Sequence, residues 1–282
     1  MKIGVLGAGS WGTALAILLH ENGHEVTLWS IDKREVAMID EKREQVEKLP
    51  GVMIPDRIAV TNDVESSVTG KDMLVMAVPS IFVRSTSKMI APYIKEGQLI
   101  VNVAKGIEED TLMNMTDIIE DEIKQARVGV LSGPSHAEEV GRRIPTTVVA
   151  GAHDKATAEE IQEAFMSPVF RVYTSPDMVG IELGAALKNV IALAAGIVDG
   201  LGLGDNTKAA LITRGIAEIT RLGLAMGGRF ETFIGLSGIG DLIVTCTSTH
   251  SRNHNAGYLI GQGKSYQEAM DEVKMVVEGV YS

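Results

Sequence analysis

Short apolar runs and amphipathic helical stretches alternate over the first 176 residues. Ile3–Leu6, Thr13–His20 and Glu25–Trp29 read as strand, helix and strand within about 30 residues, the size of a βαβ unit. Runs of the same kind predict six further strands: Arg57–Val60, Met73–Val78, Leu99–Val103, Val128–Leu131, Thr146–Ala150 and Phe170–Tyr173. This alternation predicts an α/β fold with a doubly wound, mainly parallel sheet that carries helices on both faces.

The pattern changes after Pro176, where strand-like runs give way to long Ala/Leu/Ile/Gly helical stretches. Three helices are predicted there: Ile181–Val198, Lys208–Met226 and Tyr266–Val277. We therefore predict an α/β domain over residues 1–177 and an all-helical domain over residues 178–282. No linker separates them, so we expect them to dock and to form a ligand site where they meet.

Composition narrows the function classes. The chain has 282 residues, 45% hydrophobic and 22% charged, which is typical of a globular protein and excludes disorder and collagen. Its 26 Lys and Arg against 37 Asp and Glu give a net charge of -11, which repels nucleic acids and acidic membrane surfaces. We therefore expect neither nucleic acid nor an acidic membrane as a partner. An anionic ligand would need a local group of positive charges to bind.

Two further features indicate a cytoplasmic protein. The single cysteine, Cys246, excludes an internal disulfide and fits a reducing compartment. The longest apolar stretch, Val179–Leu203, carries Glu182, Lys188, Asn189 and Asp199, each costly in a bilayer. We predict a buried helix there, with no stable membrane insertion.

A glycine-rich turn follows the first predicted strand and opens the first predicted helix. It reads Gly7-Ala8-Gly9-Ser10-Trp11-Gly12, a G-x-G-x-x-G pattern. The first glycine allows the tight turn, the second lets the backbone approach a pyrophosphate, and the third lets helix and strand pack closely. In its βαβ context the pattern predicts a Rossmann-type dinucleotide domain in which this turn binds the cofactor; a plain glycine-rich turn is the alternative.

The identity of the dinucleotide stays open. Asp32 lies twenty residues after Gly12, where an acid would bind the ribose 2′-hydroxyl of NAD. Lys33 and Arg34 follow it and would hold the 2′-phosphate of NADP, so the basic pair favours NADP. A solvated turn residue is the alternative for Asp32.

Six short strings, in order and spread over the whole chain, carry a family resemblance: Gly7–Ala14, Ala104–Glu108, Leu131–Ala137, Leu187–Val190, Gly238–Leu242 and Ser251–Asn253. Together they resemble the NAD(P)-dependent sn-glycerol-3-phosphate dehydrogenases of bacteria. The resemblance implies reduction of dihydroxyacetone phosphate to glycerol 3-phosphate, feeding phospholipid synthesis. Members of that family usually continue for several tens of residues past Val276–Gly279, so the helical domain is expected to be incomplete.

Reduction of a ketone by a nicotinamide needs a proton donor at the carbonyl oxygen. Lys188 is the leading candidate, because its apolar neighbours predict burial and burial lowers a lysine pKa towards neutrality. A lysine that extends to the rim of its helix is the alternative. The resemblance implies that Lys188 is the proton donor and acceptor.

Asp241 lies in the glycine-rich turn Gly238-Ile239-Gly240-Asp241. A carboxylate there would orient a buried ammonium, or would simply cap a helix. The resemblance implies that Asp241 contacts both the substrate and the lysine.

Ser251, Arg252 and Asn253 offer a hydroxyl, a guanidinium fork and an amide in consecutive positions, which suits a phosphate; a solvated polar loop is the alternative. The resemblance implies that all three bind substrate and that Arg252 also reaches the cofactor.

Further site residues follow the ends of predicted strands. Lys105 follows Leu99–Val103, at the carboxyl edge where open α/β sheets bind ligands, although a surface lysine is the simpler interpretation. The resemblance places Lys105 against cofactor and substrate, Gly133 and Ser135 against substrate, and Ala137 against cofactor. For these three a plain strand-to-helix turn is the alternative. Val276 and Glu278 are implied as cofactor contacts.

Other signals are weaker. His250 and His254 are four residues apart, a spacing suited to metal ligands, but no third ligand is evident and we predict no metal site. Cys246 lacks a base partner and is expected to be a small packed residue. Two rival functions remain: another two-domain dehydrogenase, such as a ketopantoate or hydroxyacid reductase, and an NAD(P)H-binding sensor without turnover. A homodimer is left open.

Overall fold

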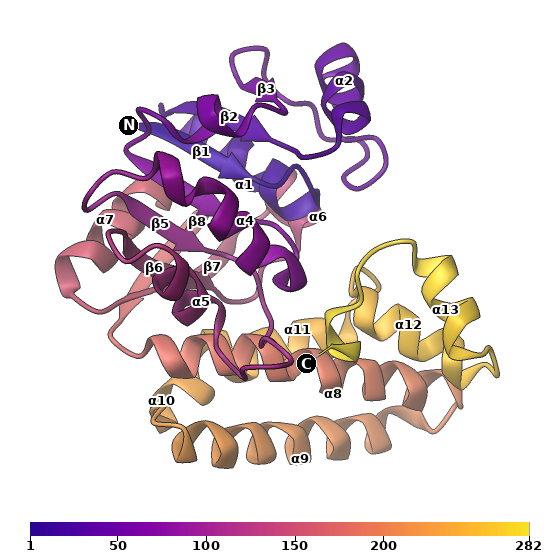
Figure 1. The fold of residues 1–282 in the computed structure, drawn as a ribbon. Coiled ribbons are helices and arrows are strands. Elements are labelled where there is room, and N and C mark those ends of the chain that lie inside the picture. The colour runs from indigo at the N-terminus through magenta and orange to yellow at the C-terminus, as the bar shows by residue number, and fades with distance from the viewer. Residues whose placement is uncertain (282) are drawn as a thin grey trace. The chain divides into compact units, whose positions relative to one another are not determined.

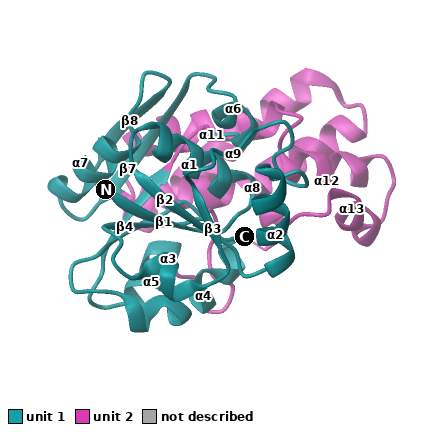
Figure 2. Ribbon diagram, turned by 90° about the horizontal axis from the view of Figure 1, so that it is seen from above, with its two compact units in different colours: residues 1–104, 115–131, 135–176 teal, residues 105–114, 132–134, 177–282 magenta. Residues whose placement is uncertain are grey.

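The computed structural model describes residues 1–281 and divides into two compact units (Figure 2). Unit 1 comprises residues 1–104, 115–131 and 135–176, and unit 2 comprises residues 105–114, 132–134 and those from 177 on. The prediction of two contiguous domains was wrong for residues 105–114 and 132–134. These segments lie at the carboxyl ends of two strands, and Ile107 packs against the apolar core of unit 2.

Unit 1 is built on an eight-stranded sheet, as predicted. Its strands are β1 (Lys2–Leu6), β2 (Glu25–Trp29), β3 (Ala59–Thr61), β4 (Met73–Met76), β5 (Leu99–Asn102), β6 (Arg127–Ser132), β7 (Thr146–Ala152) and β8 (Phe170–Ser175). They lie in the order β3-β2-β1-β4-β5-β6-β7-β8. The pairs β1–β2, β1–β4, β2–β3, β4–β5, β5–β6 and β7–β8 are parallel. The chain reverses its direction of winding between β1 and β4, which places the end of β1 where doubly wound sheets bind ligands.

Helices cover both faces of this sheet. They are α1 (Ser10–Glu21), α2 (Lys33–Lys42), α3 (Val64–Val68), α4 (Val83–Ile90), α5 (Met115–Glu122), α6 (Ala137–Gly141) and α7 (Lys155–Phe165), with single turns η1 (Ser80–Phe82) and η2 (Ala91–Tyr93). α1 packs with α6 and α7, whereas α4 packs with α3 and α5, and Figure 2 shows these groups on opposite faces. Every residue of β4 and β5 is buried, which explains their unbroken apolar runs.

Unit 2 is helical and is organised around one long helix. Its elements are α8 (Met178–Gly200), α9 (Gly204–Ala225), α10 (Phe230–Phe233), the π-helical turn η3 (Leu236–Gly240), α11 (Asp241–Thr247), α12 (Arg252–Gly261), α13 (Tyr266–Val273) and the turn η4 (Glu278–Val280). α8 contacts α9, α11, α12 and η4, and Figure 1 shows α8 and α9 running side by side.

Three predicted helix ends were wrong by four residues each, and the first is the start of α9, which begins at Gly204 rather than at Lys208. The pattern of Thr111–Ile123 predicts a helix, but residues 107–114 form a small hairpin, with a bridge between Ile107 and Asn114 and with Leu112 at φ +58°, so α5 begins at Met115 rather than at Thr111. Lys274 takes the left-handed conformation at φ +56° and ends α13 at Val273.

Within residues 1–281, two segments are long and apolar enough to cross a membrane, by length and composition alone: α8 and the stretch Phe230–Thr247. In α8, 61% of the 18-residue apolar stretch is buried inside the protein. Glu182, Lys188 and Asn189 are themselves buried there. α8 is thus the core helix of unit 2. The second stretch is broken into α10, η3 and α11.

Candidate active site

The glycine turn has the geometry of a phosphate loop. Gly7 has φ +119°, and a Cβ at Gly12 would lie 1.9 Å from the carbonyl oxygen of Gly7, so both positions require glycine. A Cβ at Gly9 would meet nothing within 4 Å, so the backbone is open to a ligand at the position that the motif reserves for the pyrophosphate. α1 begins at Ser10 and directs its unpaired N–H groups to the same place.

An unused donor lies in this loop. The indole N–H of Trp11 is buried and has no hydrogen-bond partner among residues 1–281. A buried donor without a partner is costly, and an anionic oxygen would satisfy it. The loop residues therefore fit the pyrophosphate of a dinucleotide.

Asp32 lies just beyond β2 and is the N-cap of α2, a role that the sequence interpretation did not include. Its Oδ1 accepts a hydrogen bond from the Arg34 backbone N–H at 2.9 Å, and its Oδ2 lies 3.1 Å from Arg34 Nη2. These contacts with Arg34 lower the pKa of Asp32 and raise the pKa of Arg34. The Arg34 side chain is 93% exposed, so its charge is accessible to a ligand.

A polar cluster that the sequence did not reveal links this region to the phosphate loop. Glu35 accepts hydrogen bonds from Ser30, Lys48 and Gln45, the last at 2.7 Å. Gln45 Nε2 also donates to the carbonyl oxygen of Ala8 at 2.7 Å. Sequence spacing carries no signal for this cluster, because Gln45 and Lys48 lie in the irregular segment after α2.

Three predicted site residues meet in unit 2. Lys188 Nζ lies 2.6 Å from Asp241 Oδ1, and Lys105 Nζ lies 2.8 Å from Asp241 Oδ2. The side chains are 7%, 1% and 18% exposed for Lys188, Asp241 and Lys105. Lys188 therefore does not extend to the rim of its helix, and Lys105 is no ordinary surface lysine. Lys105 Nζ also donates to the carbonyl oxygen of Gly133 at 3.1 Å, which brings a fourth predicted residue to the cluster.

Thr245 belongs to the same cluster, and the sequence interpretation missed it. Lys188 Nζ donates to Thr245 Oγ1 at 2.6 Å, and that hydroxyl donates to the backbone carbonyl of Asp241 at 2.6 Å. Thr245 follows Asp241 by four residues on α11, so the i, i+4 spacing was the available signal.

The electrostatics of the cluster suit proton transfer. Burial lowers the pKa of Lys188 to about 7, with Asp241 opposing the shift and Lys105 adding to it. Burial works against ionisation of Asp241, but the ammoniums of Lys105 and Lys188 outweigh it and keep the pKa of Asp241 below its usual value. The N-cap alternative for Asp241 was wrong, because Gly240 is the N-cap of α11 and the Asp241 carboxylate bonds to the two lysines.

The tripeptide Ser251–Asn253 opens α12, so the solvated-loop alternative was wrong. The hydroxyl of Ser251 is the N-cap and accepts from the His254 backbone N–H at 3.2 Å. Asn253 is 7% exposed and its amide bonds within unit 2, whereas Arg252 is half-buried and contributes no ion pair within residues 1–281. Of the three, Arg252 is the residue with its charge available to a phosphate.

The remaining predicted contacts are split between the units. Ser135 and Ala137 belong to unit 1, where Ala137 begins α6 after His136. Val276 and Glu278 belong to unit 2. Val276 is half-buried, and Glu278 is 8% exposed.

Two weaker signals have ordinary structural explanations. His254 places Nε2 2.7 Å from Oδ2 of Asp199, which also pairs with Lys208. Cys246 is fully buried, and burial raises the pKa of its thiol to about 12, so it packs in the core of unit 2.

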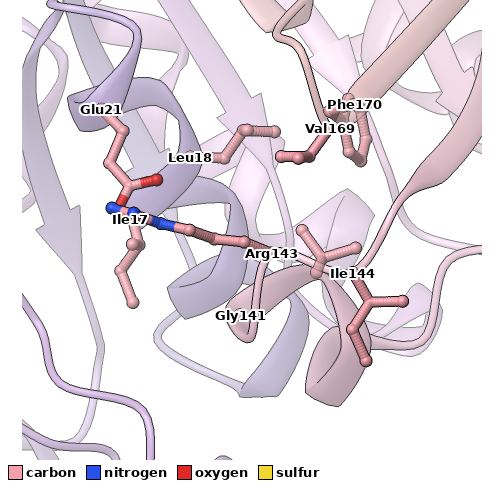
Figure 3. A pocket seen from close by; sticks show the side chains of 9 residues that line it. Ile17, Leu18, Glu21, Gly141, Arg143, Ile144, Val169 and Phe170 are labelled. Carbon is pink, nitrogen blue, oxygen red and sulfur yellow. The ribbon is translucent and has the colours of Figure 1, made fainter.

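A small pocket in unit 1 is lined by other residues (Figure 3). Apolar side chains including Ile17, Leu18 and Phe170 line it, and Arg143 pairs with Glu21 at its edge. It contains none of the predicted site residues.

Comparison with known proteins identifies the family. The model of the NAD-dependent glycerol-3-phosphate dehydrogenase N-terminus matches residues 2–158, and that of the C-terminus matches residues 177–282. The chain is 63% identical over 281 residues to a glycerol-3-phosphate dehydrogenase (NAD(P)+) of Agathobacter rectalis, covering 100% of this chain and 84% of that protein. A relative of the same name in Fusobacterium nucleatum is 62% identical over 284 residues, covering 100% of this chain and 85% of that protein.

Solved structures agree. A crystal structure of glycerol-3-phosphate dehydrogenase from Coxiella burnetii superposes with a TM-score of 0.96 at 36% identity, covering 99% of this chain and 86% of that one. A ketopantoate reductase from Ralstonia eutropha reaches a TM-score of 0.63 at 17% identity, covering 100% of this chain and 99% of that one, which shows the shared fold alone. The chain therefore belongs to the NAD-dependent glycerol-3-phosphate dehydrogenase family.

Proposed function

We propose that the chain catalyses the reversible, NAD(P)H-dependent reduction of dihydroxyacetone phosphate to sn-glycerol 3-phosphate. The observation that carries this proposal is the buried ammonium of Lys188, held 2.6 Å from Asp241 with its pKa lowered to about 7 by burial. A lysine in that state exchanges a proton near neutral pH. Family membership supplies the substrate.

Each residue of the cluster has a distinct role. The bound cofactor supplies the hydride. The Lys188 ammonium donates a proton to the ketone oxygen, and in the reverse direction the neutral amine takes the proton of the alcohol. Asp241 and Thr245 hold the lysine Nζ, since both bond to it. Lys105 adds positive charge beside the carboxylate, which favours a phosphorylated, anionic substrate.

The other binding roles follow the family resemblance. We assign substrate binding to Lys105, Gly133, Ser135, Lys188, Asp241, Ser251, Arg252 and Asn253. We assign cofactor binding to Gly7, Gly9, Ser10, Trp11, Gly12, Asp32, Arg34, Lys105, Ala137, Arg252, Val276 and Glu278. The open backbone at Gly9 and the unpaired indole N–H of Trp11 support the pyrophosphate part of this assignment.

NADP is the proposed preferred cofactor. The 93% exposed Arg34 is a cation immediately beyond β2, where dinucleotide folds bind the 2′-substituent of the ribose, and Asp32 is already engaged with it. NAD remains the alternative, since Asp32 is 44% exposed and lies at the same place.

The cellular setting is a cytoplasmic supply of glycerol 3-phosphate for phospholipid synthesis. A single, fully buried cysteine supports the compartment. Exposed apolar side chains at the end of α9 and beyond it, Leu222, Leu224, Met226 and Phe230, support self-association as a homodimer. Light scattering of the purified protein measures that state.

Initial rates of NADPH oxidation test the function. We expect oxidation with dihydroxyacetone phosphate, a loss of turnover of roughly 100-fold to 10,000-fold in Lys188→Ala, and retained cofactor binding in that variant. Lys155→Ala is the matched control, because its side chain is 82% exposed and it lies on α7 in unit 1. Turnover of ketopantoate instead would favour the rival reductase, and cofactor binding without turnover of any ketone would favour a sensor.

A further inference from the structure

The side-chain amide of Asn253 joins three segments of unit 2. Its Nδ2 donates to Oδ1 of Asn189 on α8 at 3.0 Å, and its Oδ1 accepts from the backbone N–H of Gly279 in η4 at 2.8 Å. Asn189 and Asn253 are only 4% and 7% exposed. Both ends of this buried amide are therefore used to hold segments of the protein together.

Gly279 lies directly on the backbone of α8. A Cβ at this position would lie 2.4 Å from the carbonyl oxygen of Asn189 and 2.9 Å from Oδ1 of Asn253, which no side chain can occupy without moving the segment. Asn189 follows Lys188 on α8. The close approach thus places η4 beside the stretch of α8 that carries the buried ammonium.

We infer that Asn189 and Asn253 are positioning residues that act through Gly279. Together they fix residues 276–280 on α8, and so hold Val276 and Glu278 where these contact the nicotinamide cofactor. This inference rests on the proposed function, which assigns both residues to cofactor binding. Without the amide, the Gly279 N–H loses its acceptor at a buried position, and the segment separates from α8 to reach water.

The inference distinguishes two roles for Asn253. A residue that only binds substrate would affect the Michaelis constant for dihydroxyacetone phosphate. A residue that positions residues 276–280 affects cofactor binding first, and Asn189 shares the effect because its Oδ1 accepts from Asn253.

Hydrogen exchange of the cofactor-free protein tests the contact itself. We expect a peptide covering residues 274–281 to exchange roughly tenfold faster in Asn253→Ala and Asn189→Ala than in the wild type, as loss of a buried hydrogen bond predicts. Asn206→Ala, at an exposed position on α9, is the matched control and should leave the exchange unchanged. Unchanged exchange in Asn253→Ala would overturn the inference.

Steady-state kinetics test the consequence. We expect the Michaelis constant for NADPH to rise roughly tenfold in each of three variants, Asn253→Ala, Asn189→Ala and Gly279→Ala. This rise should be larger than any rise in the Michaelis constant for dihydroxyacetone phosphate. Gly279→Ala retains the side chains of Asn189 and Asn253 and displaces only the segment. It therefore shows the effect of moving the segment without the loss of a polar group. A rise confined to dihydroxyacetone phosphate would overturn the inference. If the wild type does not oxidise NADPH with this ketone, the proposed function fails, and the exchange experiment still decides whether the amides hold the segment.

Discussion

Lys188 on α8 and Asp241 on α11 form a buried ion pair, with Nζ 2.6 Å from Oδ1, although 53 residues separate them in the chain. The second carboxylate oxygen of Asp241 pairs with Lys105 at 2.8 Å. One carboxylate thus serves two ammoniums, and the cluster keeps one excess positive charge while both lysines are protonated. Burial makes that charge costly and lowers the pKa of Lys188 to about 7, and Lys105 adds to the shift.

The first prediction concerns pH. The pKa of Lys188 is lowered to about 7, so the ammonium predominates below that pH and the amine above it. Ketone reduction needs the ammonium, and we expect kcat/KM for dihydroxyacetone phosphate to fall as the pH rises through about 7. Alcohol oxidation needs the amine, so kcat/KM for glycerol 3-phosphate should rise over the same range. Initial-rate profiles in both directions measure this, and parallel profiles would contradict it.

The second prediction concerns Thr245→Val, which removes one acceptor from the Lys188 ammonium without changing the side-chain shape. We expect kcat to fall roughly tenfold to 100-fold, since hydrogen bonds to charged groups contribute about 1.5–3 kcal/mol. The midpoint of the pH profile should move down, because the ammonium loses stabilisation. Thr245→Ser retains the hydroxyl and should restore most of the activity. Equal losses in both variants would argue for a packing role.

The third prediction concerns Arg252→Ala. Its guanidinium is the charge at the start of α12 that we assign to the substrate phosphate, so the Michaelis constant for dihydroxyacetone phosphate should rise roughly tenfold to 100-fold. Arg221→Ala is a suitable control, because Arg221 is 60% exposed and pairs only with Glu218 among the ion pairs of residues 1–281. An unchanged Michaelis constant in Arg252→Ala would remove the phosphate role.

The fourth prediction concerns the choice of cofactor. Arg34→Ala should raise the Michaelis constant for NADPH roughly tenfold while leaving that for NADH within about twofold, since only NADPH carries the 2′-phosphate. The ratio of kcat/KM values for the two cofactors measures the change. Arg57→Ala, at another exposed position in unit 1, should leave the ratio as it is. An equal fall in kcat/KM with both cofactors would show that Arg34 does not bind the 2′-phosphate.

Several features could be predicted because their causes are local. All eight strands were predicted to within two residues at each end, and for β4 and β5 the reason is that fully buried parallel strands are continuous apolar runs. Gly7 and Gly12 follow from the turn and the close packing that they permit. The burial of Lys188 followed from its apolar neighbours on one helix. Helix ends were less predictable, because the left-handed conformations of Leu112 and Lys274 break patterns that continue in the sequence.

The amino-acid sequence by itself determined the α/β order, the glycine turn before α1, the helical second part and the burial of Lys188. Only the tertiary structure decided that Lys105 reaches Asp241 across 136 residues, that Thr245 completes the shell of Lys188, and that Asn253 holds Gly279. Hydrophobic periodicity and turn residues determine secondary structure over a few residues, so the local sequence is enough to predict it. Which distant polar groups share a buried site depends on how helices pack, and that packing is a property of the whole folded unit.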